Sequence, residues 1–110
     1  MPTKNSIFEL AGLLKEPYRH FELGTVDDHA VYVILVKGEF PMHHHTRDEM
    51  YVVVKGEIRI RFRNIPDLVL HEGESTVVRA YTTHSPDSDQ ESVVLLIKPK
   101  EMFATQMDMD

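Results

Sequence analysis

The feature that most constrains the fold is a series of short strand-like segments separated by glycine, proline or asparagine. The two most apolar segments, HAVYVILVKG (29–38) and SVVLLIKP (92–99), have β-branched and aliphatic residues on both alternating faces. EIRIRFRN (57–64) instead places an apolar residue at every second position, with arginine between. Strands spaced roughly eight to twelve residues apart predict an all-β sandwich or small barrel.

The N-terminal segment is the part of the chain with a helical pattern. Four apolar residues have the spacing of one helical face: Ile7, Leu10, Leu13 and Leu14. Asn5 or Ser6 could cap the start of a helix here, and Pro17 would end it. We therefore expect one short helix before the strands.

The length of the chain, 110 residues, predicts one domain, since a single core typically serves roughly 100 to 200 residues. We expect residues 1–20 to form a helical and extended segment that packs on a β-barrel domain at 21–104. The ending TQMDMD (105–110) is polar and acidic, and it predicts a disordered tail.

Charge and composition exclude several classes of function. A net charge of −6 repels phosphate backbones, so we expect no nucleic-acid partner. The chain has no cysteine, so any metal would be held by His, Asp or Glu. The longest apolar runs, VYVILV and VVLLI, are too short to span a bilayer, and the start MPTKNSIFEL lacks the features of a signal peptide. We expect a cytoplasmic protein without a membrane partner.

A metal-site pattern lies in MHHHTRDEMYVVVKG. In a strand, side chains two apart point the same way, so His43 and His45 share a face and His44 opposes them. In an unbroken strand Glu49 would lie on the same face as His43 and His45, although the residues before it have the composition of a turn. Two imidazoles and a carboxylate would bind a divalent first-row metal and leave coordination positions open. Solvated loop histidines and a surface carboxylate are the alternative interpretation.

This segment resembles the first motif of the cupins, G-x5-H-x-H-x(3,4)-E-x6-G. Gly38, His43, His45, Glu49 and Gly56 take its places, and Gly38 stands one residue closer to the first histidine than in the pattern. The resemblance implies a small double-stranded β-helix, the jelly-roll barrel of the cupins. The stretch GEFPMHHHTRDEMYVVVKGEIRI is also similar to small single-domain cupins that carry the label mannose-6-phosphate-isomerase-like.

The second cupin motif, G-x5-P-x-G-x2-H-x3-N, is matched in part. Gly73 and His84 stand at its expected separation. Arg79 replaces the proline, Tyr81 the second glycine and Ser88 the asparagine. The sequence therefore departs from the family in the turn before His84.

Carried over residue by residue, the two motifs imply one metal site. The resemblance covers residues 31–99 and implies that His43, His45, Glu49 and His84 ligate one divalent transition metal inside the barrel. Iron, manganese, zinc and nickel all suit this ligand set. Each ligand also has an ordinary alternative, because a histidine in a turn and a carboxylate at the surface need no metal.

Three further residues are candidates for contact with a substrate. Tyr51 has the parity of Glu49, so it would line the cavity or serve as a core tyrosine. Arg79 and Tyr81 alternate along a segment leading to His84, so they would point at a ligand or lie on a solvated outer face. An arginine facing the cavity would neutralise a carboxylate or phosphate.

Two other sets of residues are predicted to lie at the surface. The arginines of the alternating strand are interpreted as a solvated outer face: Arg59, Arg61 and Arg63. Three histidines have no partner pattern and are interpreted as surface or turn residues: His20, His29 and His71.

Two functions fit these observations. The first is a metal-dependent enzyme acting on a small, anionic molecule by dioxygenase, isomerase or decarboxylase chemistry, among which the fold does not choose. The alternative is a non-catalytic module that binds or senses a small molecule in the barrel. Because several strands are apolar on both faces, we also expect the N-terminal segment or a second subunit to cover the outer face, and we predict a homodimer.

Overall fold

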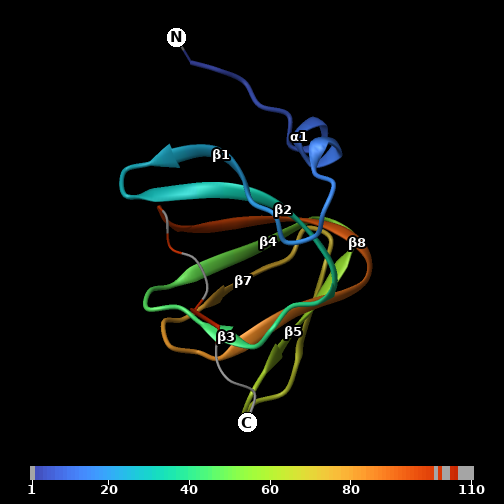
Figure 1. The fold of residues 1–110 in the computed structure, drawn as a ribbon, viewed down its shortest axis with the longest axis vertical. Helices are drawn as coiled ribbons and strands as arrows, with labels where there is room; N and C mark the ends of the chain where they lie inside the picture. The colour runs from blue at the N-terminus through green and yellow to red at the C-terminus, as the bar shows by residue number, and fades with distance from the viewer. Residues whose placement is uncertain (1, 101, 103–104, 107–110) are drawn as a thin grey trace.

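In the computed structural model, the described residues are 2–100, 102 and 105–106, and they form one helix and nine strands (Figure 1). The elements in chain order are α1 (Ile7–Leu13), β1 (Phe21–Val26), β2 (His29–Glu39), β3 (His43–His44), β4 (Glu49–Lys55), β5 (Glu57–Phe62), β6 (Leu68–His71), β7 (Ser75–Val78), β8 (His84–Pro99) and β9 (Thr105–Gln106). The prediction of an all-β chain with one short helix is confirmed.

The long strand β8 organises the barrel. It pairs antiparallel with β2, β3, β4 and β5, while β1 extends the sheet beyond β2, β7 pairs with β4 and β6 pairs with β5. The register of β2 on β8 shifts between Val36 and Gly38. Residues 84–87 of β8 pair with β3 and β5, and residues 93–97 pair with β4, so the sheet closes into the barrel seen in Figure 1.

The interior of the barrel is filled by alternating side chains. Tyr32, Ile34 and Val36 of β2 point inward, where they pack with Val53 and Ile60 from neighbouring strands. These residues are at most 5% exposed. The alternation predicted for EIRIRFRN is confirmed on this side, because Ile58 and Ile60 are buried.

The opposite face of β2 is covered by the N-terminal helix. Val33 and Leu35 form a second buried cluster with Val93 of β8 and Ala11 of α1. Ser6 caps the helix, since its side chain accepts a hydrogen bond from the backbone of Glu9. The expected cover of two-sided strands by the N-terminal segment is therefore present. Leu13, which was expected on the packed face, is exposed, because the face that packs consists of Ile7, Leu10, Ala11 and Leu14.

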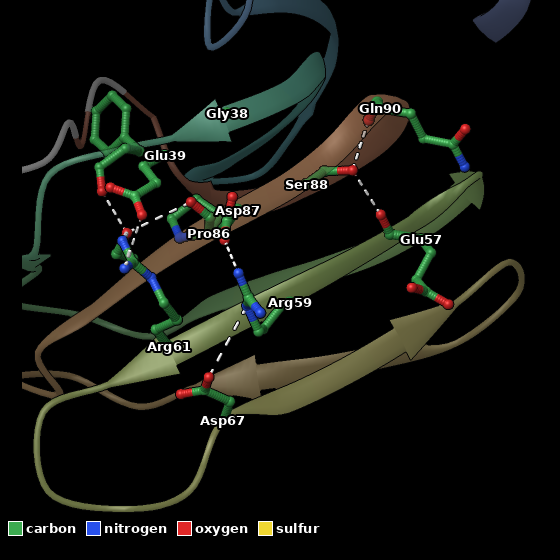
Figure 2. A network of polar contacts seen from close by, with 12 residues as sticks. Gly38, Glu39, Glu57, Arg59, Arg61, Asp67, Pro86, Asp87, Ser88 and Gln90 are labelled. Carbon is green, nitrogen blue, oxygen red and sulfur yellow. Dashed lines mark hydrogen bonds and ion pairs between the residues drawn. The ribbon is translucent and has the colours of Figure 1, made fainter.

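Arg59 and Arg63 are exposed, as predicted for the arginine face, whereas Arg61 is partly buried. Figure 2 shows the polar contacts that Arg59 and Arg61 make. The register of β5 on β8 places Arg59 opposite Asp87 and Arg61 opposite Ser85. Arg59 forms an ion pair with the buried Asp87, and Arg61 donates to Ser85 Oγ at 3.1 Å. These arginines therefore connect β5 to β8 through polar contacts.

The first two residues of the expected disordered tail form a strand. Thr105–Gln106 form β9, which pairs antiparallel with β3, in place of the predicted disorder. Residues 107–110 of the predicted tail lie outside the described residues. Within the part of the chain that the structure describes, no helix is long and apolar enough to cross a membrane.

Candidate metal centre

The four residues predicted as ligands come together at one end of the barrel. His43 begins β3, Glu49 begins β4 and His84 begins β8, while His45 follows β3 directly. One ligand atom from each residue lies within 4.8 Å of the others, and all four side chains are at most 5% exposed. The structure thus gathers into one buried cluster residues as far apart in sequence as His43 and His84.

Local backbone contacts explain this convergence. The pairing of β3 with β8 places His43 directly opposite His84. The chain bends at Thr46–Arg47 and then enters β4, so Glu49 comes from a new strand. Tyr81 N donates to His45 O at 2.7 Å and ties the turn before β8 to the histidine segment.

Hydrogen bonds fix the orientation of two imidazole rings. The Nδ1 atoms of His43 and His84 lie 2.8 Å from the carbonyl oxygens of Pro41 and Thr82. Because a carbonyl only accepts, each Nδ1 carries the proton, and each Nε2 presents a lone pair. Burial lowers the pKa of His43 to about 4, so its ring is neutral at pH 7, the form that binds metals.

The remaining polar atoms of the cluster fit a metal ion. Glu49 Oε1 and His84 Nε2 are buried and have no hydrogen-bond partner among the described residues, and neither does His45 Nδ1. The Nε2 atoms of His45 and His84 lie 3.3 and 3.5 Å from Glu49 Oε1, outside hydrogen-bond geometry. An unsatisfied buried polar atom costs about 1–3 kcal/mol. A cation bound to Glu49 Oε1 and His84 Nε2 would remove that cost for these two atoms.

Glu49 is held in its ionised form. Burial by itself would raise the pKa of this carboxyl, but contacts with His45 and His84 and the charge of Lys98 outweigh burial and lower the pKa below its usual range. The cluster therefore combines three imidazoles with one carboxylate, a donor set suited to divalent first-row metals.

A cavity of about 290 Å³ adjoins the cluster. His43, His45 and Glu49 line one part of it, and the remainder is mainly aromatic and aliphatic: Tyr18, Ile34, Phe40, Tyr51, Pro86 and Leu96. A mostly apolar cavity with a few convergent polar groups is typical of a small-molecule site.

The three candidate substrate contacts have different outcomes. Tyr51 lines the cavity and is buried, and burial, followed by the neighbouring Glu49, raises the pKa of its hydroxyl well above the ordinary value. Arg79 instead forms an exposed ion pair with Asp48 at 3.0 Å, and Tyr81 is 69% exposed. Of the two alternatives left open for Arg79 and Tyr81, the structure has the solvated outer face, because β7 ends at Val78 and the alternation of a strand stops there.

Sequence reasoning missed three residues that line the cavity. Lys98 is 2% exposed near the end of β8, and its Nζ lies 3.0 Å from His20 Nε2. The prediction that His20 lies at the surface is wrong, because the bend after α1 brings it against Lys98 and Tyr32. Tyr18 donates from its hydroxyl to Gly38 O at 2.5 Å. The position of Lys98 two residues after Leu96 was a signal that it faces inward.

Comparison with known proteins agrees with this architecture. The family described as "Cupin domain" matches residues 30–98. The chain is 29% identical over 102 residues to the uncharacterized protein YdbB of Bacillus subtilis (strain 168), covering 92% of this chain and 90% of YdbB. YdbB carries no stated activity to compare.

Solved structures with a similar fold include a cupin-2 domain containing protein from Shewanella frigidimarina. The two are 25% identical with a TM-score of 0.83, and the match covers 87% of this chain and 94% of that protein. Hydroquinone 1,2-dioxygenase PnpCD, solved with Cd²⁺ and 4-hydroxybenzonitrile, has a TM-score of 0.76 and 20% identity. This match covers 86% of this chain and 71% of the PnpCD chain. Because the family match spans more than half of the chain, the protein belongs to the cupin domain family.

Proposed function

We propose that this cupin is a metal-dependent enzyme that acts on a small molecule bound beside the metal. The observation that carries the proposal is the buried cluster of His43, His45, Glu49 and His84, which opens onto a cavity of about 290 Å³. These four residues would hold a divalent metal at the edge of the cavity, where it would act as a Lewis acid on a bound substrate.

The cluster residues would hold one divalent iron, manganese, zinc or nickel ion, which supplies Lewis acidity when bound and, in the case of iron, affinity for O2. His43 and His84 are already oriented by their Nδ1 hydrogen bonds. Tyr51 and the apolar wall would bind the body of the substrate and exclude water from the metal.

Among the chemistries that cupins support, the cavity favours a dioxygenase-type reaction. Its walls are mainly aromatic and aliphatic, whereas a sugar substrate needs polar groups for its hydroxyls. Hydroquinone 1,2-dioxygenase PnpCD has the same fold, and its structure contains both a metal and a small aromatic ligand. These points support an aromatic or otherwise apolar substrate for this protein.

Metal analysis tests the binding site first. Protein purified without a nickel column should contain about one equivalent of metal per chain, and His43→Ala and His84→Ala should lose it. His44→Ala is the matched control, since His44 is not in the cluster and should retain the metal. Wild-type protein that binds no stoichiometric metal under any loading condition would contradict the proposal.

Oxygen consumption then separates an enzyme from a binding module. The iron-loaded protein should consume O2 with at least one member of a panel of small phenols and aromatic acids, and the His84→Ala variant should not. Ligand binding without turnover, for every metal tested, would favour the alternative of a non-catalytic binding or sensing cupin.

A further inference from the structure

Lys98 places a positive charge in the wall of the metal-site cavity. Its side chain is 2% exposed, and its Nζ lies 3.0 Å from His20 Nε2 and 3.7 Å from Glu49 Oε2. The ring of His20 is fixed, because its Nδ1 lies 3.2 Å from Tyr18 O and donates to it. His20 Nε2 therefore accepts from Lys98 and holds the ammonium group at the cavity.

The two oxygens of Glu49 face different neighbours. Oε1 lies 3.3 Å from His45 Nε2 and 3.5 Å from His84 Nε2, among the candidate metal ligands. Oε2 is turned toward Lys98. Lys98 and Glu49 line the same cavity, so a ligand bound there beside the metal would also be near the ammonium group.

The charges of this site do not balance once a metal is bound. Among the described residues that line the cavity, Glu49 and Lys98 are the charged ones, and their charges cancel. A divalent cation would then leave an excess of two positive charges in a buried, largely apolar space. Uncompensated charge is costly there, so the metal-loaded site should favour an anion in an open coordination position.

The rest of the cavity defines the body of that anion. Ile34 and Leu96 provide aliphatic surface, and Tyr18, Phe40 and Tyr51 provide aromatic rings. Such walls suit a flat apolar group and offer little to a polyhydroxylated one.

We propose that the cavity takes a small organic anion, a carboxylate or phenolate with an apolar body, and that Lys98, positioned by His20, determines this specificity. The inference rests on the proposed metal site and names the class of substrate for it. The charged oxygen of the ligand would bind at the metal within the field of the Lys98 ammonium group, and its body would lie against the apolar wall.

The test compares a charged and a neutral ligand of the same shape on zinc-loaded protein. Calorimetry should show that the wild type binds benzoate about tenfold or more tightly than benzamide, the effect of one charge-assisted contact. Lys98→Met should reduce this preference by about fivefold or more while still binding zinc, because one of the two excess positive charges is removed. Lys37→Met, the same change at an exposed strand position, should keep it.

Zinc content measured in the same samples separates the two proposals. A wild type that binds one zinc but shows no preference for benzoate would overturn this inference and leave the metal site standing. A wild type that binds no zinc would overturn both. Lys98→Gln is the second variant if Lys98→Met does not fold, and an unchanged preference in either folded variant would overturn the role of Lys98.

Discussion

At the scale of single residues, Glu49 connects the cluster to the cavity. It is 2% exposed, one oxygen faces His45 and His84, and the other faces Lys98. A buried carboxylate survives only where positive charge or hydrogen bonds compensate its lost hydration. In this protein Lys98 provides positive charge beside Oε2, and a metal bound at Oε1 would provide more, which explains why an acidic residue can begin the apolar strand β4.

The change Glu49→Gln should therefore weaken metal binding without a change of shape. We expect the affinity for zinc to fall by roughly 100-fold, because the only anionic ligand of the cluster is replaced by a neutral amide. Competition with a chromophoric chelator would measure the change. Glu91→Gln, at an exposed position of β8, is the matched control and should bind as the wild type does. Equal affinities for the two variants would contradict a ligand role for Glu49.

The candidate metal ligands could be predicted from the sequence, but the position of His20 could not. His43, His45, Glu49 and His84 could be named from motif spacing because each stands in or beside a strand start whose order is fixed by the fold. His20 could not be named, since its position depends on how the segment after α1 bends back over the barrel.

At the scale of elements, the strands were predictable and the turns were not. β2 and β8 were evident from apolar runs, and β5 from its alternation, because these patterns reflect burial directly. The alternatives at Arg79 and Tyr81 stayed open because the parity of β7 does not extend past Val78, into a turn where Tyr81 has φ 64°. Side-chain direction in a turn depends on such backbone angles, which spacing does not encode.

The turn between β4 and β5 gives a prediction for stability. Gly56 has φ +96°, and a Cβ atom there would meet the side chain of Ser92 and lie 3.1 Å from its Cα. Gly56→Ala should lower the free energy of unfolding by about 1–3 kcal/mol, through left-handed strain and this clash. Chemical denaturation would measure it.

Gly12→Ala provides the contrast for that experiment. Gly12 lies in α1, and an added Cβ there would contact nothing within 4 Å. This change should leave stability unchanged or raise it by up to about 1 kcal/mol, because alanine favours helix. If Gly56→Ala proved as harmless as Gly12→Ala, the described β4–β5 turn would be wrong.

At the scale of the whole molecule, the outer surface retains apolar groups that α1 does not cover. Phe8 and Leu13 of the helix are 58% and 64% exposed, and Val26 of the edge strand β1 is 66% exposed. In the described part of the sheet, β1 pairs on one side only, with β2. An open strand edge beside apolar side chains favours association with a second copy.

We therefore expect a homodimer in solution. Light scattering coupled to size exclusion should give a mass of twice the 12.7 kDa of one chain at micromolar concentration. Val26→Lys, which puts a charge at the edge, should shift the equilibrium toward the monomer. A monomeric mass for the wild type at that concentration would contradict this expectation.

Anomalous diffraction tests most directly whether one metal binds among three histidines and a glutamate inside the barrel. Crystals of metal-loaded protein, measured at the absorption edge of the metal, should give one peak about 2.0–2.3 Å from nitrogen atoms of His43, His45 and His84 and an oxygen of Glu49. This peak should lie beside the apolar cavity. A map without a peak there, or with metal only at exposed histidines such as His29 and His71, would contradict binding at that site.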